Sequence, residues 1–478
     1  MSSVLSPTAP PGAAPEPTRP IWSLTPLLRR LHFYAGLLVA PFLIVAAVSG
    51  LAYSVAPQID DILYSDVLYS RTDTGPQRTL AEQVTAARTA VPDGTLTGVL
   101  PADGDKATRV VFARPGLGAD YRRTVYVDPH TADVQGQLTT WFGSTPAVTW
   151  LDGLHRHLQL GEPGRLYSEL AASWLWLIAL GGLILWWGRL RGRRRLRALL
   201  TPEKGIRGVR RTRSWHAAIG VWTLLGALLL SATGLTWSTY AGDNFNTALT
   251  ALRAKAVPLD TTLPGSTGAP GMGGGHEGHG VSAAGADRAP TDPATFDRVL
   301  LAARTAGLTG PLEIGVAEEP GSAWTAAQVD NVWPVRRDQI AADPTTGAVT
   351  ARASFADRPF LARLTTLGVQ AHMGVLFGPA NQIFLALTAL GILTMIVLGY
   401  RMWWQRRPTR ADRRSRLGAP PVRGGWRGLP LWALIPGPLV VVAVGWAIPL
   451  LGLSLAAFLV LDLVIGTARR SRRPASAT

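Results

Sequence analysis

Long apolar stretches constrain this sequence more than any other feature. They occur at about 31–56, 166–188, 215–240, 377–404 and 429–467. The first four are each near the roughly 20 residues that cross a bilayer as a helix. The last is too long for one crossing and contains Gly445 and Pro449, so it predicts two helices and six in all. The charged content of 16% is also below the roughly 25% typical of soluble domains.

The charges indicate how the chain crosses the membrane. Residues 189–213 and 401–427 are strongly basic, whereas the long segments 57–165 and 241–371 hold most of the acidic residues. The positive-inside rule then places both termini and the short loops in the cytoplasm. The net charge of +16 therefore indicates topology and contact with anionic lipid, and no nucleic-acid partner is expected. The absence of cysteine excludes thiolate metal sites and covalently attached haem.

The expected organisation is an α-helical integral membrane protein with two α+β domains outside the membrane and a C-terminal helical hairpin. The first half is expected to have a disordered cytoplasmic tail (1–26), a first membrane helix (27–56), a first outer domain (57–153), an outer His segment with a second helix (154–188) and a basic loop (189–213). The second half is expected to have a third helix (214–240), a second outer domain (241–368) with a His/Gly linker (257–290), an outer His segment with a fourth helix (369–404) and a basic loop (405–428). Helices five and six (429–467) and a cytoplasmic tail (468–478) are expected to complete the chain.

An internal repeat underlies this organisation. Residues 31–54 align with 215–238 at an offset of 184, which superimposes Gly50 on Gly234. The second and fourth helices align at an offset of 217, and the turns VDPHTADV (127–134) and ADPTTGAV (342–349) align at 215. The chain therefore reads as a duplicated helix–domain–helix unit. The Trp pairs at 186–187 and 403–404 are expected to anchor the inner membrane interface.

Four histidines occupy repeat-equivalent positions at helix ends: His32, His216, His155 and His372. An ionisable group at membrane depth is a functional hypothesis by default. Two facing imidazoles can bind one haem iron, so the pattern suggests two haems, one between His32 and His216 and one between His155 and His372. His157 is an alternative outer ligand, and the breaks at 161–164 and 378–379 are expected to set the outer histidines on short helices. Structural histidines and a path for metal ions remain alternatives.

These residues and motifs resemble the PepSY-associated transmembrane family of iron-regulated membrane proteins. The resemblance rests on His32 with Gly36 and Ser49-Gly50, on LHRHLQLGEPG at 154–164, on the Trp-Trp-Gly-Arg exit at 186–189 and on the two DP-containing turns. It implies a protein of the bacterial cytoplasmic membrane with PepSY-like outer domains. It also implies b-type haems held by His32, His155, His216 and His372. Some members are ferric-siderophore reductases, which implies electron transfer from the cytoplasmic or quinol side to an outer ferric chelate.

No cytoplasmic segment is long enough for a flavin or NAD domain, so the electron donor is expected to be a quinol or a separate reductase. Met272, His276 and His279 form a weak candidate metal site within the linker. Two other functions remain open. One is a non-enzymatic membrane protein whose outer domains bind a regulatory partner, and the other is a copper or iron transport-related protein.

Overall fold

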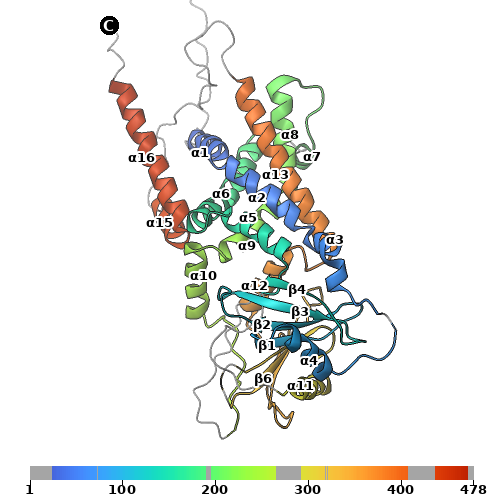
Figure 1. Cartoon of the computed structure of the whole chain (residues 1–478). Helices are drawn as coiled ribbons and strands as arrows, with labels where there is room; N and C mark the ends of the chain where they lie inside the picture. The colour runs from blue at the N-terminus through green and yellow to red at the C-terminus, as the bar shows by residue number, and fades with distance from the viewer. Residues whose placement is uncertain are drawn as a thin grey trace, which may run out of the picture.

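The computed structural model describes residues 24–72, 74–189, 195–264, 292–317, 319, 321–406 and 436–471. A bundle of apolar helices stands on one antiparallel sheet, and short helices lie between the two (Figure 1). The weak linker site Met272, His276 and His279 lies outside the described residues, as do residues 1–23 of the expected tail 1–26 and residues 472–478 of the expected tail 468–478.

Four segments form the main helical bundle. Two are single helices long and apolar enough to cross a membrane, α6 (Glu162–Trp187) and α13 (Pro379–Gln405). The other two are bent pairs, α1 (Leu24–Leu38) with α2 (Ala40–Tyr53), and α8 (Gly208–Trp222) with α9 (Leu224–Thr236). The described residues therefore hold two such helices, or up to four spans if each bent pair counts as one.

Both bends fall at positions that the repeat relates. The first pair bends by 58° at Val39 and the second by 57° at Thr223. Proline stands in the first turn of α2, where it removes a backbone donor. Thr223 instead directs its hydroxyl back to the carbonyl oxygen of Ile219, a bond that often bends helices. Different side chains therefore accompany the same bend in the two halves.

The C-terminal hairpin packs on the bundle through polar contacts. It consists of α15 (Pro436–Ala447) and α16 (Pro449–Ser471). Trp174 donates its indole N–H to the hydroxyl of Ser454 at 2.9 Å, and Arg30 forms a buried ion pair with Asp462. As described, α15 has 12 residues and a length of about 18 Å. That is shorter than the roughly 30 Å hydrocarbon core, but residues 429–435 of the expected fifth helix lie outside the described residues, so its crossing stays a prediction.

The strands expected in two separate outer domains form one continuous sheet. Its order is β4-β3-β2-β1-β5-β6-β7-β8, and every neighbouring pair is antiparallel. The strands are β1 (Thr95–Leu100), β2 (Thr108–Ala113), β3 (Tyr121–Val127), β4 (Val134–Trp141), β5 (Leu312–Gly315), β6 (Trp324–Gln328), β7 (Gln339–Ala342) and β8 (Val349–Ala353). Gly98 allows β1 and β5 to meet, because a Cβ there would lie 2.9 Å from the carbonyl oxygen of Ile314.

Two helices cover the face of the sheet directed away from the bundle (Figure 1). These are α4 (Leu80–Ala90) and α11 (Ala294–Thr305). Val84 and Val299 are fully buried there in one core shared by both halves of the sheet. Asp297 joins the helices, because its carboxylate accepts the backbone N–H groups of Leu80 and Ala81 at the start of α4.

Short helices connect the sheet to the bundle. They are α3 (Ala56–Leu68), α10 (Tyr240–Ala251), α5 (Pro146–His157) and α12 (Phe360–His372), and α7 (Arg195–Leu200) precedes α8 on the opposite side of the bundle. The break expected at 161–164 is confirmed, because α5 ends at His157 and α6 begins at Glu162. Gly378 likewise separates α12 from α13.

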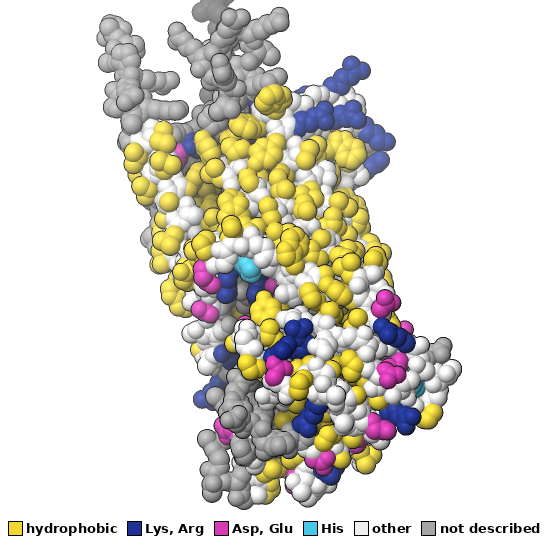
Figure 2. Space-filling model, in the orientation of Figure 1, with side chains coloured by type: hydrophobic (Ala, Val, Ile, Leu, Met, Phe, Trp, Pro, Cys, Tyr) yellow, Lys and Arg dark blue, Asp and Glu magenta, His cyan; other side chains and the backbone are white. Residues whose placement is uncertain are grey.

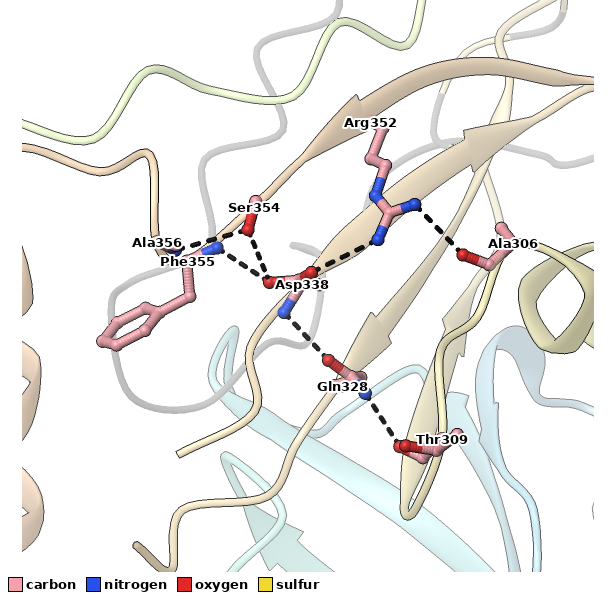
Figure 3. Close-up of polar contacts among 8 residues, drawn as sticks. All are labelled: Ala306, Thr309, Gln328, Asp338, Arg352, Ser354, Phe355 and Ala356. Carbon is pink, nitrogen blue, oxygen red and sulfur yellow. Dashed lines mark hydrogen bonds and ion pairs between the residues drawn. The ribbon is translucent and has the colours of Figure 1, made fainter. Parts of the chain in front are cut away.

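A polar network fixes the path from the sheet to α12 (Figure 3). Asp338, just before β7, accepts the hydroxyl of Ser354 at 3.1 Å and the backbone N–H of Phe355 at 2.8 Å. Its own N–H donates to Gln328 of β6, and Arg352 of β8 contacts its carboxylate at 3.5 Å. The end of β8 is thereby held where the chain turns toward α12.

The surface divides into zones that match a membrane protein. In Figure 2 hydrophobic side chains cover most of the helical bundle, Lys and Arg gather at its far end, and charges of both signs mix over the sheet region. Large apolar side chains such as Leu225, Val397 and Leu387 are more than 60% exposed on the bundle. Exposed apolar patches of this extent are expected where a helix faces lipid.

The Asp-Pro turns at 127–134 and 342–349 have the same shape, but the first is more deeply buried in the protein. Asp128 is 2% exposed, and its carboxylate accepts the hydroxyl of Ser70 and the backbone N–H groups of Arg71, Thr72, His130 and Thr131. Asp343 accepts only Thr345 and Thr346 in the same way and lies nearer to solvent. Ala132 adopts the left-handed conformation with φ of 64° that glycine supplies at Gly347.

We predict that Asp128→Asn destabilises the outer region by about 1–3 kcal/mol, because the amide offers the N–H donors around it a weaker acceptor. Burial opposes ionisation of Asp128, but the hydrogen bonds from His130, Ser70, Thr131 and Thr72 outweigh it and hold its pKa below the usual range. The stabilisation is therefore complete above about pH 4 and is lost as the pH falls through this lowered pKa.

Denaturant unfolding of the wild type and of Asp128→Asn between pH 3 and pH 7 measures their difference in the free energy of unfolding. Asp343→Asn is the matched control and should cost less, because Asp343 has fewer donors. Equal losses for both variants would contradict the assignment.

Candidate functional site

The four repeat-equivalent histidines meet as two pairs within the bundle. The ring centroids of His32 and His216 lie 6.3 Å apart with an interplanar angle of 88°. Those of His155 and His372 lie 6.2 Å apart with an angle of 64°. Each pair joins one histidine from the first half of the chain to one from the second.

Backbone carbonyls fix the pair of His32 and His216, here called the inner pair after the expected topology, in which His155 and His372 form the outer pair. The Nδ1 of His32 lies 3.0 Å from the carbonyl oxygen of Ile178 on α6. The Nδ1 of His216 lies 2.9 Å from the carbonyl oxygen of Met395 on α13. A carbonyl can only accept, so both histidines carry their proton on Nδ1. Their Nε2 atoms then present a lone pair.

Hydroxyl groups fix the outer pair in an equivalent way. The hydroxyl of Ser49 donates to the carbonyl oxygen of Val45 at 2.7 Å and lies 3.0 Å from the Nδ1 of His155. Thr233 likewise donates to Leu229, and its oxygen lies 2.6 Å from the Nδ1 of His372. Because each hydroxyl proton is already used, each oxygen accepts from the histidine Nδ1–H. All four imidazoles therefore have the same tautomer.

A glycine faces each of the four rings. A Cβ added at Gly182 would lie 3.0 Å from the Cε1 of His32, and one at Gly50 would lie 3.1 Å from the Cε1 of His155. The corresponding distances are 3.9 Å from Gly399 to His216 and 3.8 Å from Gly234 to His372. The imidazoles consequently pack directly against helix backbone, which leaves little freedom to rotate.

The repeat relates the partners as well as the histidines. Ile178 and Met395, like Gly182 and Gly399, are separated by 217 positions, and Ser49 and Thr233 are separated by 184. Sequence reasoning noted Gly50 and Gly234 but missed Gly182, Gly399 and the groups that accept the Nδ1–H. The offsets could have found four of these residues, because Gly182 and Gly399 lie one helical turn before the aligned Trp186 and Trp403, and Ser49 and Thr233 directly precede the aligned glycines. The carbonyls of Ile178 and Met395 give no signal in the sequence.

A cavity of about 630 Å³ surrounds the inner pair. Helices α1, α2, α6, α8, α9 and α13 line it, mostly with apolar side chains such as Leu43, Val221 and Ile396. Trp186 and Trp403 also lie in its wall. This corrects the expectation that both Trp pairs act only as interface anchors, since Trp186 is 5% exposed while the adjacent Trp187 is 49% exposed. The first member of each pair faces inward.

The remaining candidate ligands are less well placed. His157 ends α5, its Nδ1 is buried, and it has no hydrogen-bond or ring partner among the described residues. His155 is therefore the outer histidine that faces His372. Within the same described part of the chain, no group of three or more His, Cys, Asp or Glu residues is placed to hold a metal ion. The histidine pairs thus offer two protein ligands each.

The comparison with protein families agrees with this architecture. The model of the PepSY-associated TM region matches residues 29–406, which include all four paired histidines and both halves of the sheet. The chain belongs to the PepSY-associated TM family. None of the curated proteins matches it.

We predict that Gly182→Ala and Gly399→Ala differ in stability by about 1 kcal/mol or more. Both changes add the same methyl group near the C-terminal end of a helix, α6 or α13, at repeat-equivalent sites. Only the first brings it to 3.0 Å from a histidine, so only the first should force His32 to move. Thermal unfolding of the detergent-solubilised variants measures the difference, and equal melting temperatures would refute the close packing of Gly182 on His32.

Proposed function

We propose that this PepSY-associated TM protein is a di-haem electron-transfer protein of the bacterial cytoplasmic membrane. It would pass electrons from a cytoplasmic or quinol donor to a ferric chelate, such as a ferric siderophore, on the outer side. The observation that carries the proposal is the paired arrangement of four histidines, each with Nδ1–H donated to a helix oxygen and Nε2 available.

The spacing of the rings supports haem iron as the ligand of each pair. A metal–imidazole bond of about 2 Å on either side, together with the distance from ring centre to nitrogen, separates two ring centroids by about 6 Å. The observed separations are 6.3 Å and 6.2 Å. A donated Nδ1–H also fixes the ring and makes Nε2 a better ligand, as in other metal-binding histidines.

The depth of the two pairs supports transfer across the membrane. His32 and Ser49, which contacts His155, are 17 residues apart, or about 26 Å along the path of α1 and α2. The 58° bend at Val39 makes the direct distance shorter than this path. The hydrocarbon core is roughly 30 Å thick. Two b-type haems held there would supply one-electron redox centres near opposite membrane faces. The chain's own residues would orient these centres and keep water away from the inner one.

The distribution of basic residues supports electron transfer from the cytoplasmic side to the outer side. The basic segments around residues 189–213 and 401–427 support cytoplasmic loops and termini, with the sheet on the outer side. His155 and His372 then end the helices that lead from the sheet, where a chelate bound outside would approach. Reduction of the substrate iron to Fe(II) weakens its binding by hard oxygen ligands and releases it.

We predict about two low-spin b-type haems per chain in the detergent-purified protein. His32→Ala and His372→Ala should each lower the haem content to about one per chain, because each removes one ligand of a different pair. Haem extraction and reduced-minus-oxidised absorption spectra measure the content. His157→Ala is the matched control and should retain both haems. A colourless wild-type protein that takes up no added haem would favour a structural role for the histidines and a regulatory or metal-transport function.

We predict that the reduced protein is reoxidised by an outer ferric chelate through the outer pair. In anaerobic stopped-flow experiments, ferric citrate or a ferric hydroxamate should reoxidise the dithionite-reduced wild type. His372→Ala should slow this step at least tenfold, because it removes one ligand of the outer centre. Reoxidation at the same rate in both proteins would contradict a role for the outer pair.

A further inference from the structure

Four arginines surround the cytoplasmic mouth of the inner cavity. They are Arg29, Arg213, Arg189 and Arg406, and all four line the cavity. Arg29 and Arg213 are 184 positions apart, and Arg189 and Arg406 are 217 apart. The cluster therefore consists of two pairs that follow the same offsets as the histidines. General basicity of the loops would not by itself place arginine at these positions.

The cluster lacks the negative charge that usually accompanies four arginines. None of them forms an ion pair with a carboxylate among the described residues. Burial and the neighbouring charges of Arg213, Arg29 and Arg406 lower the pKa of Arg189, so these guanidinium groups are near enough to repel one another. Arg30 lies beside Arg29 in the sequence but pairs with Asp462. Two or more anionic groups at the mouth would relieve the repulsion.

Unpartnered donors in the cavity wall point to the same ligand chemistry. The indole Nε1 of Trp186 is buried, and so is the Nε of Arg213, and neither has a hydrogen-bond partner among the described residues. Burying a donor without a partner is unfavourable, because the donor loses its hydrogen bond to water. Trp186 is 5% exposed, so bulk water does not reach its Nε1 readily. An acceptor bound within the cavity would satisfy these donors.

We propose that the four arginines and Trp186 bind the two carboxylates of the macrocycle held by His32 and His216. The inference rests on the proposed function. An apolar wall around the paired imidazoles, with guanidinium groups at one end, matches a flat apolar ligand with carboxylates along one edge. Arginine is suited to this task, because its planar fork donates two parallel hydrogen bonds to a carboxylate. Bound in this way, the inner macrocycle has its carboxylate edge toward the cytoplasm.

The positive cluster also acts on the redox chemistry of the inner site. Reduction lowers the positive charge at the iron by one, and four arginines against two carboxylates leave a net positive charge that favours the reduced state. The arginines would therefore raise the midpoint potential of the inner centre and leave the outer one unchanged.

Removing the carboxylates from the ligand gives the sharpest test. Haem b and its dimethyl ester are titrated into the full-length haem-free chain carrying His372→Ala, which keeps only the inner pair intact. We expect haem b to bind about tenfold or more tightly than the diester. Arg189→Gln combined with Arg406→Gln should abolish this preference. Arg210→Gln is the matched control, because Arg210 is exposed on α8 three residues before Arg213 and does not line the cavity.

Redox potentiometry of the otherwise unaltered protein gives a second readout that needs no change at His372. The double arginine variant should lower one of the two midpoint potentials, whereas Arg210→Gln should leave both in place. Equal binding of haem b and the diester, or an equal effect of Arg210→Gln, would overturn the inference but not the proposed function. If the wild type binds no haem, both are overturned.

Discussion

The hydrogen bond from each histidine Nδ1–H to an oxygen of a neighbouring helix is the interaction on which the site depends. It fixes the tautomer, holds the ring against a glycine and directs the remaining nitrogen toward the partner histidine. An imidazole in a medium of low dielectric must find such a partner, because an unpaired polar group there is costly. The helices of the bundle pack around these four hydrogen bonds, and two of the bonds lie near each end of the bundle.

The partners of these hydrogen bonds also show what each half of the chain contributes to the site. Each histidine donates its hydrogen bond to an oxygen of its own half, as His32 does to Ile178, yet faces a histidine from the other half. Each half therefore orients its own imidazoles, and the contact between halves brings the pairs together. The sheet joins the same two halves on the outer side, since β1 and β5 pair at its centre. The pairs thus form only when both halves are in register.

Much of this site was predictable because the repeat brings equivalent residues to equivalent depths. The alignment of His32 with His216 and of His155 with His372 predicted the pairs, and the Gly-Glu-Pro-Gly run at 161–164 predicted the break before α6. Other features were not predictable. The join of β1 to β5 depends on Gly98 opposing Gly315, a contact between strands more than 200 residues apart. Trp186 and Trp187 are the same residue type at adjacent positions, and only helix rotation decides which faces the cavity.

The buried ion pair between Arg30 and Asp462 has a consequence for biosynthesis. A ribosome makes Arg30 early, and its partner follows only 432 residues later. Until α16 packs on the bundle, Arg30 lacks the carboxylate with which it pairs in the finished structure, and an unpaired cation among apolar helices is unfavourable. The nascent chain must therefore keep Arg30 near the lipid headgroups or shielded by the insertion machinery. A product truncated before Asp462 would retain this exposed charge, a mark by which membrane quality control could distinguish incomplete chains from finished ones.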